Sequence, residues 1–514
     1  MTPVDCPMPA KHASVPDMNP HSPDDPFGTR PAPARGKWRT LVRRQLATVL
    51  RHDARPAGGA AARKRRWPGR AGRGAAVLLV TVAVPVAVAV PSMTAARARL
   101  YTEPPGRMPP GRTAAVQAHD PARPTAVVVL GNEGTNAADA LPPYEVLAAS
   151  GAFNVYTVAP RRRLVPLVGG LDLVPDLDFA ELDRLLPGPP DVIVVPQIEG
   201  EPSPGSPIIS WLDRQRAGGS PLLVSVCVGA ETLAEAGYLD GRPATSNWLG
   251  LIGLRRSHPR VGWVDDVRYV DDGDVITSAG VLSGIDGTLR AVERIAGQAA
   301  AGRAAAAVRW PHYSPGRAAA ITPPHLAAAD SAGLLSAAYR WDREDLGVLL
   351  TDGVTETELA AVFRGYTELN FLARPLAFTL DGAPARSRHG LTFVPRGDAA
   401  TAAGEVDRIV VPGTAASTLT LPKALDGVPA VRPNARPGFA FDGVLLDIAR
   451  QHDTATARWV AKSVSYPVGH LDLVGPAWPW GLTLRLALLL AAGLALAGTL
   501  VHLLRRLRDR RRRS

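Results

Sequence analysis

The segment Leu222–Leu239, LLVSVCVGAETLAEAGYL, decides the fold. It opens with a short, almost wholly apolar run, which is typical of a strand buried on both faces of a parallel sheet. Cys227 follows this strand directly, and Gly229 then opens a segment of helical composition. Such a strand-to-helix turn presents its central side chain at the carboxyl edge of the sheet. The pattern S-x-C-x-G therefore predicts a cysteine-centred elbow, and the helix N-terminus is expected to lower the pKa of the thiol.

The residues around this elbow alternate between strand and helix patterns. The runs AVVVL at 126–130 and DVIVV at 191–195 are short and apolar, as buried parallel strands are. Further strands are predicted at 155–158 and 222–226, and helices at 137–150, 208–217 and 230–236. This alternation predicts a flavodoxin-like, doubly wound parallel α/β sheet.

A fainter copy of the pattern spans residues 346–470. DRIVVP at 407–412 repeats DVIVVP at 191–196 with an offset of 216 residues. Asp442–Gly443 repeats Asp286–Gly287 with an offset of 156, so the copy is shorter by the difference, 60 residues. The missing part is the one that contains the elbow. We predict a degenerate second α/β copy that packs on the first as a structural partner; the alternative is chance similarity between two α/β segments.

Two apolar runs flank this body. Residues 75–92 hold no charge, and residues 481–504 hold one, Arg485, beside Trp478 and Trp480. Runs of about 18 residues or more can cross the roughly 30 Å hydrocarbon layer as helices, and tryptophans and a snorkelling arginine suit its interface. We predict two transmembrane helices. The alternatives are a buried core helix for either run and, for the first, a secretory signal, which the 74 preceding residues disfavour.

The positive charge is concentrated in two tails. Residues 1–74 hold fifteen Lys and Arg against five Asp, and residues 505–514 hold seven Arg against one Asp. Because the whole chain carries +11, the part between the tails carries −5. Cytoplasmic flanks collect Lys and Arg, so both termini are predicted inside a cell membrane, with the folded body outside. Cys6 and Cys227 then lie on opposite sides and cannot pair.

The N-terminal tail is predicted to be largely disordered. Its segment 37–52, KWRTLVRRQLATVLRH, differs, because apolar residues recur there at helical spacing between arginines. This pattern is typical of a helix lying on an anionic membrane surface. An idle tail and nucleic-acid binding are the alternatives, and no recognition motif supports the latter. Residues 93–123 are predicted to be a Pro-rich linker.

The residues after the elbow carry a family resemblance. The segments SVCVGAETLAEAGYLDGRPATSNW at 225–248 and VITSAGVLSGID at 275–286 resemble the ThiJ/PfpI family, also called the DJ-one superfamily. The similarity is greatest to its AraC-type regulator and isonitrile-hydratase-like branch, and it covers residues 124–316. It implies a class I glutamine amidotransferase-like fold for that domain. Family members often form dimers, so either a homodimer or an intrachain pseudo-dimer with the second copy is expected.

The resemblance also assigns site residues. Cys227 matches the family's reactive cysteine, and Asp139 matches the acidic residue that approaches the thiol. The backbone N–H of Val228 is the implied oxyanion donor. The second copy offers Glu358 near the acidic position and no cysteine.

Two departures from the family pattern bear on catalysis. Asn247 stands where the family has a histidine, and an asparagine cannot take up a proton near neutral pH. Gln197 and Ile198 replace the glycines that usually follow the central strand, and their backbone is a candidate part of the oxyanion site. Whether the thiol is active is therefore left open.

Each candidate residue also has a structural alternative. Cys227 could be a small buried hydrophobe, Asp139 a charge favoured by a helix N-terminus, and Asn247 a turn or cap. We expect a solvent-reachable thiol. Three histidines are predicted to stand alone at the surface: His258, His312 and His389. No metal-ligand spacing and no phosphate loop occur, so neither a metal nor a cofactor is predicted.

Three functions are compatible with these features. The first is a membrane-anchored protein whose outer domain binds or senses a small molecule, with a regulatory role. The second is an extracytoplasmic hydrolase or hydratase of small molecules that uses Cys227 and Asp139. The third is an AraC-type transcription-regulator role, which the spans disfavour. The expected partners are the lipid bilayer and an unidentified small molecule, and nucleic acid is disfavoured.

Overall fold

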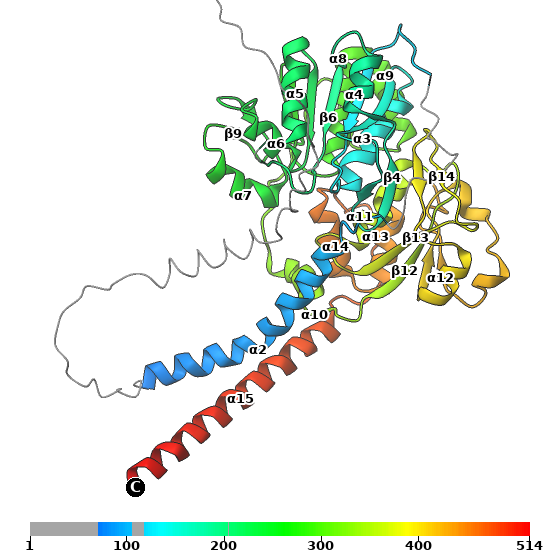
Figure 1. The fold of residues 1–514 in the computed structure, drawn as a ribbon. Coiled ribbons are helices and arrows are strands. Elements are labelled where there is room, and N and C mark those ends of the chain that lie inside the picture. Colours follow the sequence, from blue (N-terminus) through cyan, green and yellow to red (C-terminus); the bar gives the residue numbers. More distant parts are fainter. Residues whose placement is uncertain (1–69, 105–117, 204) are drawn as a thin grey trace, which may run out of the picture. The chain divides into compact units, whose positions relative to one another are not determined.

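The structure is a computed structural model, and it describes residues 70–104, 118–203 and 205–514. The predicted amphipathic segment 37–52 lies outside the described residues. A seven-stranded sheet forms the first α/β unit, with the strand order β10-β11-β7-β6-β1-β2-β5 (Figure 1). All neighbouring strands are parallel except the β10–β11 pair. The strands are β1 Thr125–Val129, β2 Asn154–Ala159, β5 Leu177–Asp178, β6 Val192–Val195, β7 Leu222–Val226, β10 Tyr269–Asp272 and β11 Val275–Ser278.

Helices cover both faces of this sheet, because side chains alternate along each buried strand. Ala126 and Val128 of β1 join one apolar cluster with α3, α8 and α9, and Val127 and Val129 join a second cluster with α4 to α7. The helices are α3 Ala137–Ala149, α4 Phe179–Leu185, α5 Pro207–Gly218, α6 Gly229–Glu235, α7 Trp248–Ser257, α8 Ser283–Ala296 and α9 Gln298–Ala307. The predicted flavodoxin-like parallel sheet is confirmed.

Local sequence signals place the helices of this unit. α3 begins after Asn136, whose side chain accepts the N–H of Ala138 at 3.0 Å. α5 begins after Ser206, whose hydroxyl oxygen accepts two backbone N–H groups, and Pro207 occupies its first turn. Both arrangements supply partners for helix N–H groups that no helical carbonyl can reach.

A second, smaller sheet follows in the chain. Its order is β13-β12-β16-β17, all parallel, which corresponds strand for strand to β2-β1-β6-β7 of the first sheet. Its strands are β12 Glu344–Leu349, β13 Ala373–Phe378, β16 Arg408–Val410 and β17 Ala430–Val431. The accompanying helices are α10 Ser331–Tyr339, α11 Glu356–Tyr366, α12 Ala399–Glu405, α13 Ala440–Gln451 and α14 Thr454–Ser463. Short 3₁₀ turns lie at Ala328–Asp330, Ala415–Thr418 and Lys423–Leu425.

The two units are joined by shared structure. An antiparallel sheet of order β14-β15-β4-β3 takes two strands from each unit, and Phe393 of β15 pairs with Leu173 of β4. Its strands are β3 Val165–Leu167, β4 Leu171–Val174, β14 Ala385–Arg386 and β15 Thr392–Val394; a further pair is β8 Pro243–Ala244 with β9 Gly262–Trp263. α3 packs on α11, and one apolar cluster includes residues of both helices.

Two long apolar helices, α2 (Arg70–Ala98) and α15 (Trp480–Arg513), pack side by side (Figure 1). Both are long and apolar enough to cross a membrane by length and composition, and their apolar side chains are mostly exposed. Both helices extend beyond their predicted bounds. α2 includes residues 93–98, expected in the linker, and α15 includes most of the expected tail 505–514, because arginine is a good helix former. Arg485, which is predicted to lie near an interface, forms an ion pair with Asp342.

Candidate functional site

Cys227 stands on the turn between β7 and α6, as the elbow pattern predicts. Its φ of 57° lies in the left-handed region, which costs a non-glycine residue about 1 kcal/mol or more. Gly229 makes the turn feasible, because a Cβ atom there would overlap the carbonyl oxygen of Val195 at the end of β6. The chain therefore holds the cysteine in a strained, fixed conformation.

The thiol itself is buried. Cys227 is 3% exposed, so the expectation of a solvent-reachable thiol is wrong. Burial raises the pKa of the thiol well above its usual value, and the charges of Asp139 and Glu368 raise it further. The hydrogen bond from the Val228 N–H and the charge of Arg364 lower the pKa of the thiol, but by less than the other effects raise it. The predicted lowering of this pKa is therefore also wrong, because burial and two carboxyl groups outweigh the helix N-terminus.

Asp139 lies beside the thiol, in the first turn of α3. It is fully buried, it accepts the backbone N–H of Gln197 at 3.2 Å, and it interacts directly with Cys227. Burial and the nearby Glu368 raise the pKa of Asp139 well above its usual value. Burial thus shifts the proton equilibrium of Asp139 toward its neutral form, relative to an exposed carboxyl group.

The structure places the other predicted site residues, Asn247, Gln197 and Ile198, in contacts with the backbone or with Asp139. Asn247 caps α7, where its side-chain oxygen accepts the N–H of Leu249 at 3.0 Å. The backbone N–H of Gln197 donates a hydrogen bond to Asp139. The next residue, Ile198, forms an isolated antiparallel β-bridge with Thr135. Among the described residues, no hydrogen bond joins Asn247 to the thiol. Its neighbour Ser246 donates a hydrogen bond to the Cys227 carbonyl oxygen at 2.8 Å.

Two site residues that the sequence did not reveal come from the second unit. Glu368, just beyond α11, accepts the amide of Asn136 at 3.1 and 3.2 Å and pairs with Arg364. Arg364 is 1% exposed. Glu368 raises the pKa of the Cys227 thiol and that of Asp139, and Arg364 lowers both. The carboxyl–thiol site is therefore completed by the second unit, a contact that depends on tertiary packing and has no local sequence signal.

A match to a known protein family covers most of the first α/β unit. Residues 125–294 match the DJ-1/PfpI family. An uncharacterized protein in the cpoL 5′ region of Streptomyces lividans is 30% identical over 144 residues, which is 27% of this chain and 98% of that protein. The chain belongs to the DJ-1/PfpI family.

Two relatives with functional names are matched over part of their length. Isonitrile hydratase of Pseudomonas putida is 32% identical over 160 residues, 30% of this chain and 65% of that protein. The HTH-type transcriptional regulator CdhR of Pseudomonas aeruginosa is 35% identical over 79 residues, 15% of this chain and 23% of that protein. The chain thus spans less than two thirds of either relative.

Part of the chain resembles several solved structures. Drosophila melanogaster DJ-1beta has 24% identity and a TM-score of 0.32, and the match covers 36% of this chain and 98% of that one. An AraC family transcriptional regulator from Pseudomonas putida has 20% identity and a TM-score of 0.32, covering 36% of this chain and 100% of that one.

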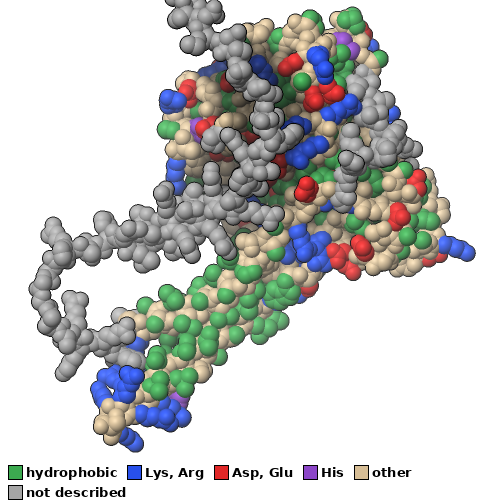
Figure 2. Space-filling view, in the orientation of Figure 1, with side chains coloured by type: hydrophobic (Ala, Val, Ile, Leu, Met, Phe, Trp, Pro, Cys, Tyr) green, Lys and Arg blue, Asp and Glu red, His purple; other side chains and the backbone are tan. Residues whose placement is uncertain are grey.

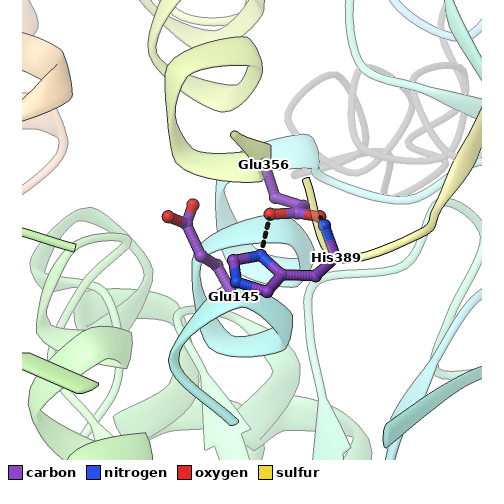
Figure 3. A group of neighbouring side chains, drawn as sticks. All are labelled: Glu145, Glu356 and His389. Atoms are coloured by element: carbon purple, nitrogen blue, oxygen red, sulfur yellow. Dashed lines mark hydrogen bonds and ion pairs between the residues drawn. The ribbon is translucent and has the colours of Figure 1, made fainter. Parts of the chain in front are cut away.

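A second polar cluster lies between the DJ-1/PfpI domain and the second unit (Figure 3). Glu145, Glu356 and His389 have potential metal-ligand atoms within 4.8 Å of one another. Glu356 already accepts hydrogen bonds from the Ser387 hydroxyl at 2.6 Å and from the backbone and ring of His389 at 3.1 and 2.8 Å. Glu145 accepts the Thr357 N–H at 2.7 Å. Burial raises the pKa of Glu145 to about 7. Burial lowers the pKa of His389, but its hydrogen bond to Glu356 and the charge of Glu356 bring that pKa above its usual value. The three side chains offer the kinds of donor atom that a metal ion binds.

The histidines predicted to stand alone at the surface have partners. His389 pairs with Glu356, and its side chain is 19% exposed. His258 contacts Glu235 at 3.3 Å, and His312 stacks edge-on against Trp310 with ring centroids 5.0 Å apart. The expectation that they stand alone was wrong, because tertiary contacts bring each side chain against a neighbour.

Gly229→Ala is expected to destabilise the DJ-1/PfpI domain by about 2–3 kcal/mol, because the added methyl group would meet backbone atoms that cannot move aside. Gly250→Ala in α7 is the matched control, since its methyl group would find neighbours only at 3.8 and 4.0 Å. That change is expected to be neutral or to stabilise by up to about 1 kcal/mol. Thermal unfolding of the purified protein in detergent measures both; equal melting temperatures would contradict the close approach at Gly229.

Proposed function

We propose that this chain is a membrane-anchored DJ-1/PfpI-family protein whose extracytoplasmic body binds and senses a small molecule, with a regulatory role. The observation that carries the proposal is the state of Cys227. Its thiol is buried between two carboxyl groups that raise its pKa, and no histidine is among the described groups that act on it. Such a thiol is held in its neutral form, which is a poor nucleophile.

Membrane anchoring is supported by the two long helices. α2 and α15 expose leucine and valine side chains along most of their length, which a lipid environment would cover. Arginines precede α2 in the sequence and occupy the last turn of α15. By the positive-inside rule we place both termini in the cytoplasm and the body outside.

We further propose that the second unit, residues 346–470, is a degenerate copy that serves as an intrachain partner of the domain at 124–316. The matching strand orders support this. Glu358 occupies the third position of α11, as Asp139 does in α3, and accepts the backbone N–H of Thr414 after β16 at 2.9 Å. Asp139 accepts a backbone N–H after β6 in the same way.

An extracytoplasmic hydrolase or hydratase is the second candidate. The strained φ of Cys227 favours it, because backbone strain is often stored at reactive sites. The 32% identity to an isonitrile hydratase favours the same chemistry. A transcription-regulatory role, suggested by the name of the CdhR relative, has no support in the geometry of the site.

Turnover separates the first two candidates. The purified full-length protein in detergent is assayed with isonitriles and with small esters and amides, beside Cys227→Ala. We expect no product formation above the level of the variant, because burial keeps the thiol neutral and no histidine is among the described groups that act on it. A rate that falls at least 100-fold in Cys227→Ala would overturn the sensing proposal in favour of the enzyme.

Topology is tested with introduced cysteines, because the native Cys227 is buried. In a background of Cys6→Ser and Cys227→Ala, the exposed positions Gln298 and Ser514 are each replaced by cysteine. A membrane-impermeant maleimide is expected to label Gln298→Cys on intact cells and Ser514→Cys only after permeabilisation. The reverse pattern would place the body in the cytoplasm.

A further inference from the structure

A cavity of about 450 Å³ lies where α2 ends, and both α/β units line it. Leu100 and Thr102 contribute from the segment after α2, and Gly169 and Gly170 from the DJ-1/PfpI domain. Thr367 and other residues contribute from the second unit. In Figure 2, basic and acidic side chains gather where the apolar helix pair joins the body.

The cavity has an apolar wall. Ala95 on α2 and Leu100 just after it line this wall. Trp341, Phe371 and Pro375 line it from the second unit. Trp341 is 49% exposed, so this wall is open to a ligand or to lipid. A chain of methylene groups would find contacts here that a small inorganic ion would not use.

The cavity also carries an excess of positive charge. Of its four arginines, Arg374 pairs with Asp345 and Arg396 pairs with Asp172. Arg343 donates to the carbonyl oxygens of Phe371 and Ala337, at 2.8 and 2.9 Å, rather than to a carboxylate.

Within the described part of the chain, two of these arginines therefore lack an anionic partner. Neither Arg99 nor Arg343 forms an ion pair with any acidic side chain of the described residues. Burial and then the charges of Arg340, Arg374 and Arg99 lower the pKa of Arg343 to about 10. A bound anion would offset this repulsion.

We propose that the cavity binds an anionic amphiphile, its phosphate head on Arg99 and Arg343 and its alkyl chain along the apolar wall. This deepens the proposed function by naming the class of molecule sensed, and a membrane source for it rests on the proposed anchoring. The head would lie near the end of α2, where a membrane-crossing helix leaves the bilayer.

The position of the cavity connects it to the thiol. Tyr101 lies between the cavity residues Leu100 and Thr102, and its ring packs so closely on Gly134 that a Cβ there would overlap it. Burial raises the pKa of the Tyr101 phenol well above its usual value, and the charges of Glu368 and Asp139 raise it further. A ligand in the cavity would therefore contact Leu100 and Thr102. These are the two neighbours of Tyr101, which packs against the thiol site.

Binding is tested on the full-length protein in detergent micelles, by native mass spectrometry and thermal shift. The probes are dioleoyl phosphatidylglycerol, the matched phosphatidylcholine and inorganic phosphate. We expect phosphatidylglycerol to bind at least fivefold more tightly than phosphatidylcholine, and inorganic phosphate to leave the melting temperature unchanged. The double variant Arg99→Gln/Arg343→Gln should weaken phosphatidylglycerol binding at least tenfold, and Arg256→Gln, an exposed arginine on α7, should not.

A further variant keeps the test decisive if the double variant Arg99→Gln/Arg343→Gln misfolds. Ala95→Trp would fill the cavity from an exposed position on α2 and should abolish binding while the protein remains folded. Unchanged phosphatidylglycerol binding in both variants, or inorganic phosphate binding as tightly as the lipid, would overturn the proposal. Because this assay needs no intact membrane, its outcome is independent of the maleimide labelling that tests the orientation.

Discussion

Replacing Glu368 by glutamine is expected to speed the alkylation of Cys227 at pH 7.5 by roughly tenfold, the effect of lowering a thiol pKa by about one unit. Glu368 raises the pKa of the thiol in the wild-type protein, and it pairs with the buried Arg364. The glutamine variant removes the negative charge and leaves the guanidinium without its partner. Both changes favour the thiolate, and the variant keeps the size of the side chain.

The measurement is the rate of reaction with iodoacetamide between pH 6 and pH 10. Limited access lowers the rate at every pH, whereas the midpoint of the profile reports the pKa. For the wild-type protein we expect a midpoint above that of free cysteine, about 8.5. Glu405→Gln, at an exposed position on α12, is the control and should leave the midpoint unchanged. Arg364→Gln should shift the midpoint upward, opposite to Glu368→Gln; equal midpoints in all three variants would show that the second unit does not tune the thiol.

The first α/β unit was predictable from sequence because its signals are local. The run Leu222–Val226 is β7 with the predicted bounds, and Ala137–Ser150 differs from α3 by one residue at its end. Short apolar runs, a capping asparagine and a glycine after the cysteine each act within a few residues. Such signals place an elbow without describing what packs over it.

The state of the thiol was not predictable for the same reason. Cys227 is surrounded by groups from α3 and from the end of α11, and Asn136 and Glu368 are 232 positions apart in the chain. Neither the burial of the thiol nor the pairing of His389 with Glu356 follows from spacing or composition. These features arise when the second unit packs on the first, and only three-dimensional contacts specify them.

Asp172→Ala is expected to destabilise the protein by about 3–5 kcal/mol, the usual cost of removing one partner from a buried ion pair. Asp172 lies on β4, is 1% exposed, and accepts hydrogen bonds from the Arg396 Nε and Nη2 atoms at 2.8 and 2.7 Å. Arg396 belongs to the second unit and also donates to the Thr102 carbonyl oxygen at 2.9 Å. The variant would leave a guanidinium that is 14% exposed without its carboxylate.

The comparison with Asp345→Ala makes this a test of how the two units depend on each other. Asp345 pairs with Arg374, but the two side chains are 41% and 37% exposed, so water can replace the lost partner and the expected cost is below about 1 kcal/mol. Chemical denaturation in detergent measures both variants. Since β4 and β15 share one sheet, loss of the Asp172 pair should lower the stability of both units in a single transition. If the DJ-1/PfpI domain instead kept its wild-type midpoint while the second unit unfolded early, the second unit would be a separable appendage, and the Glu368 and Arg364 contacts at the thiol would be dispensable for folding.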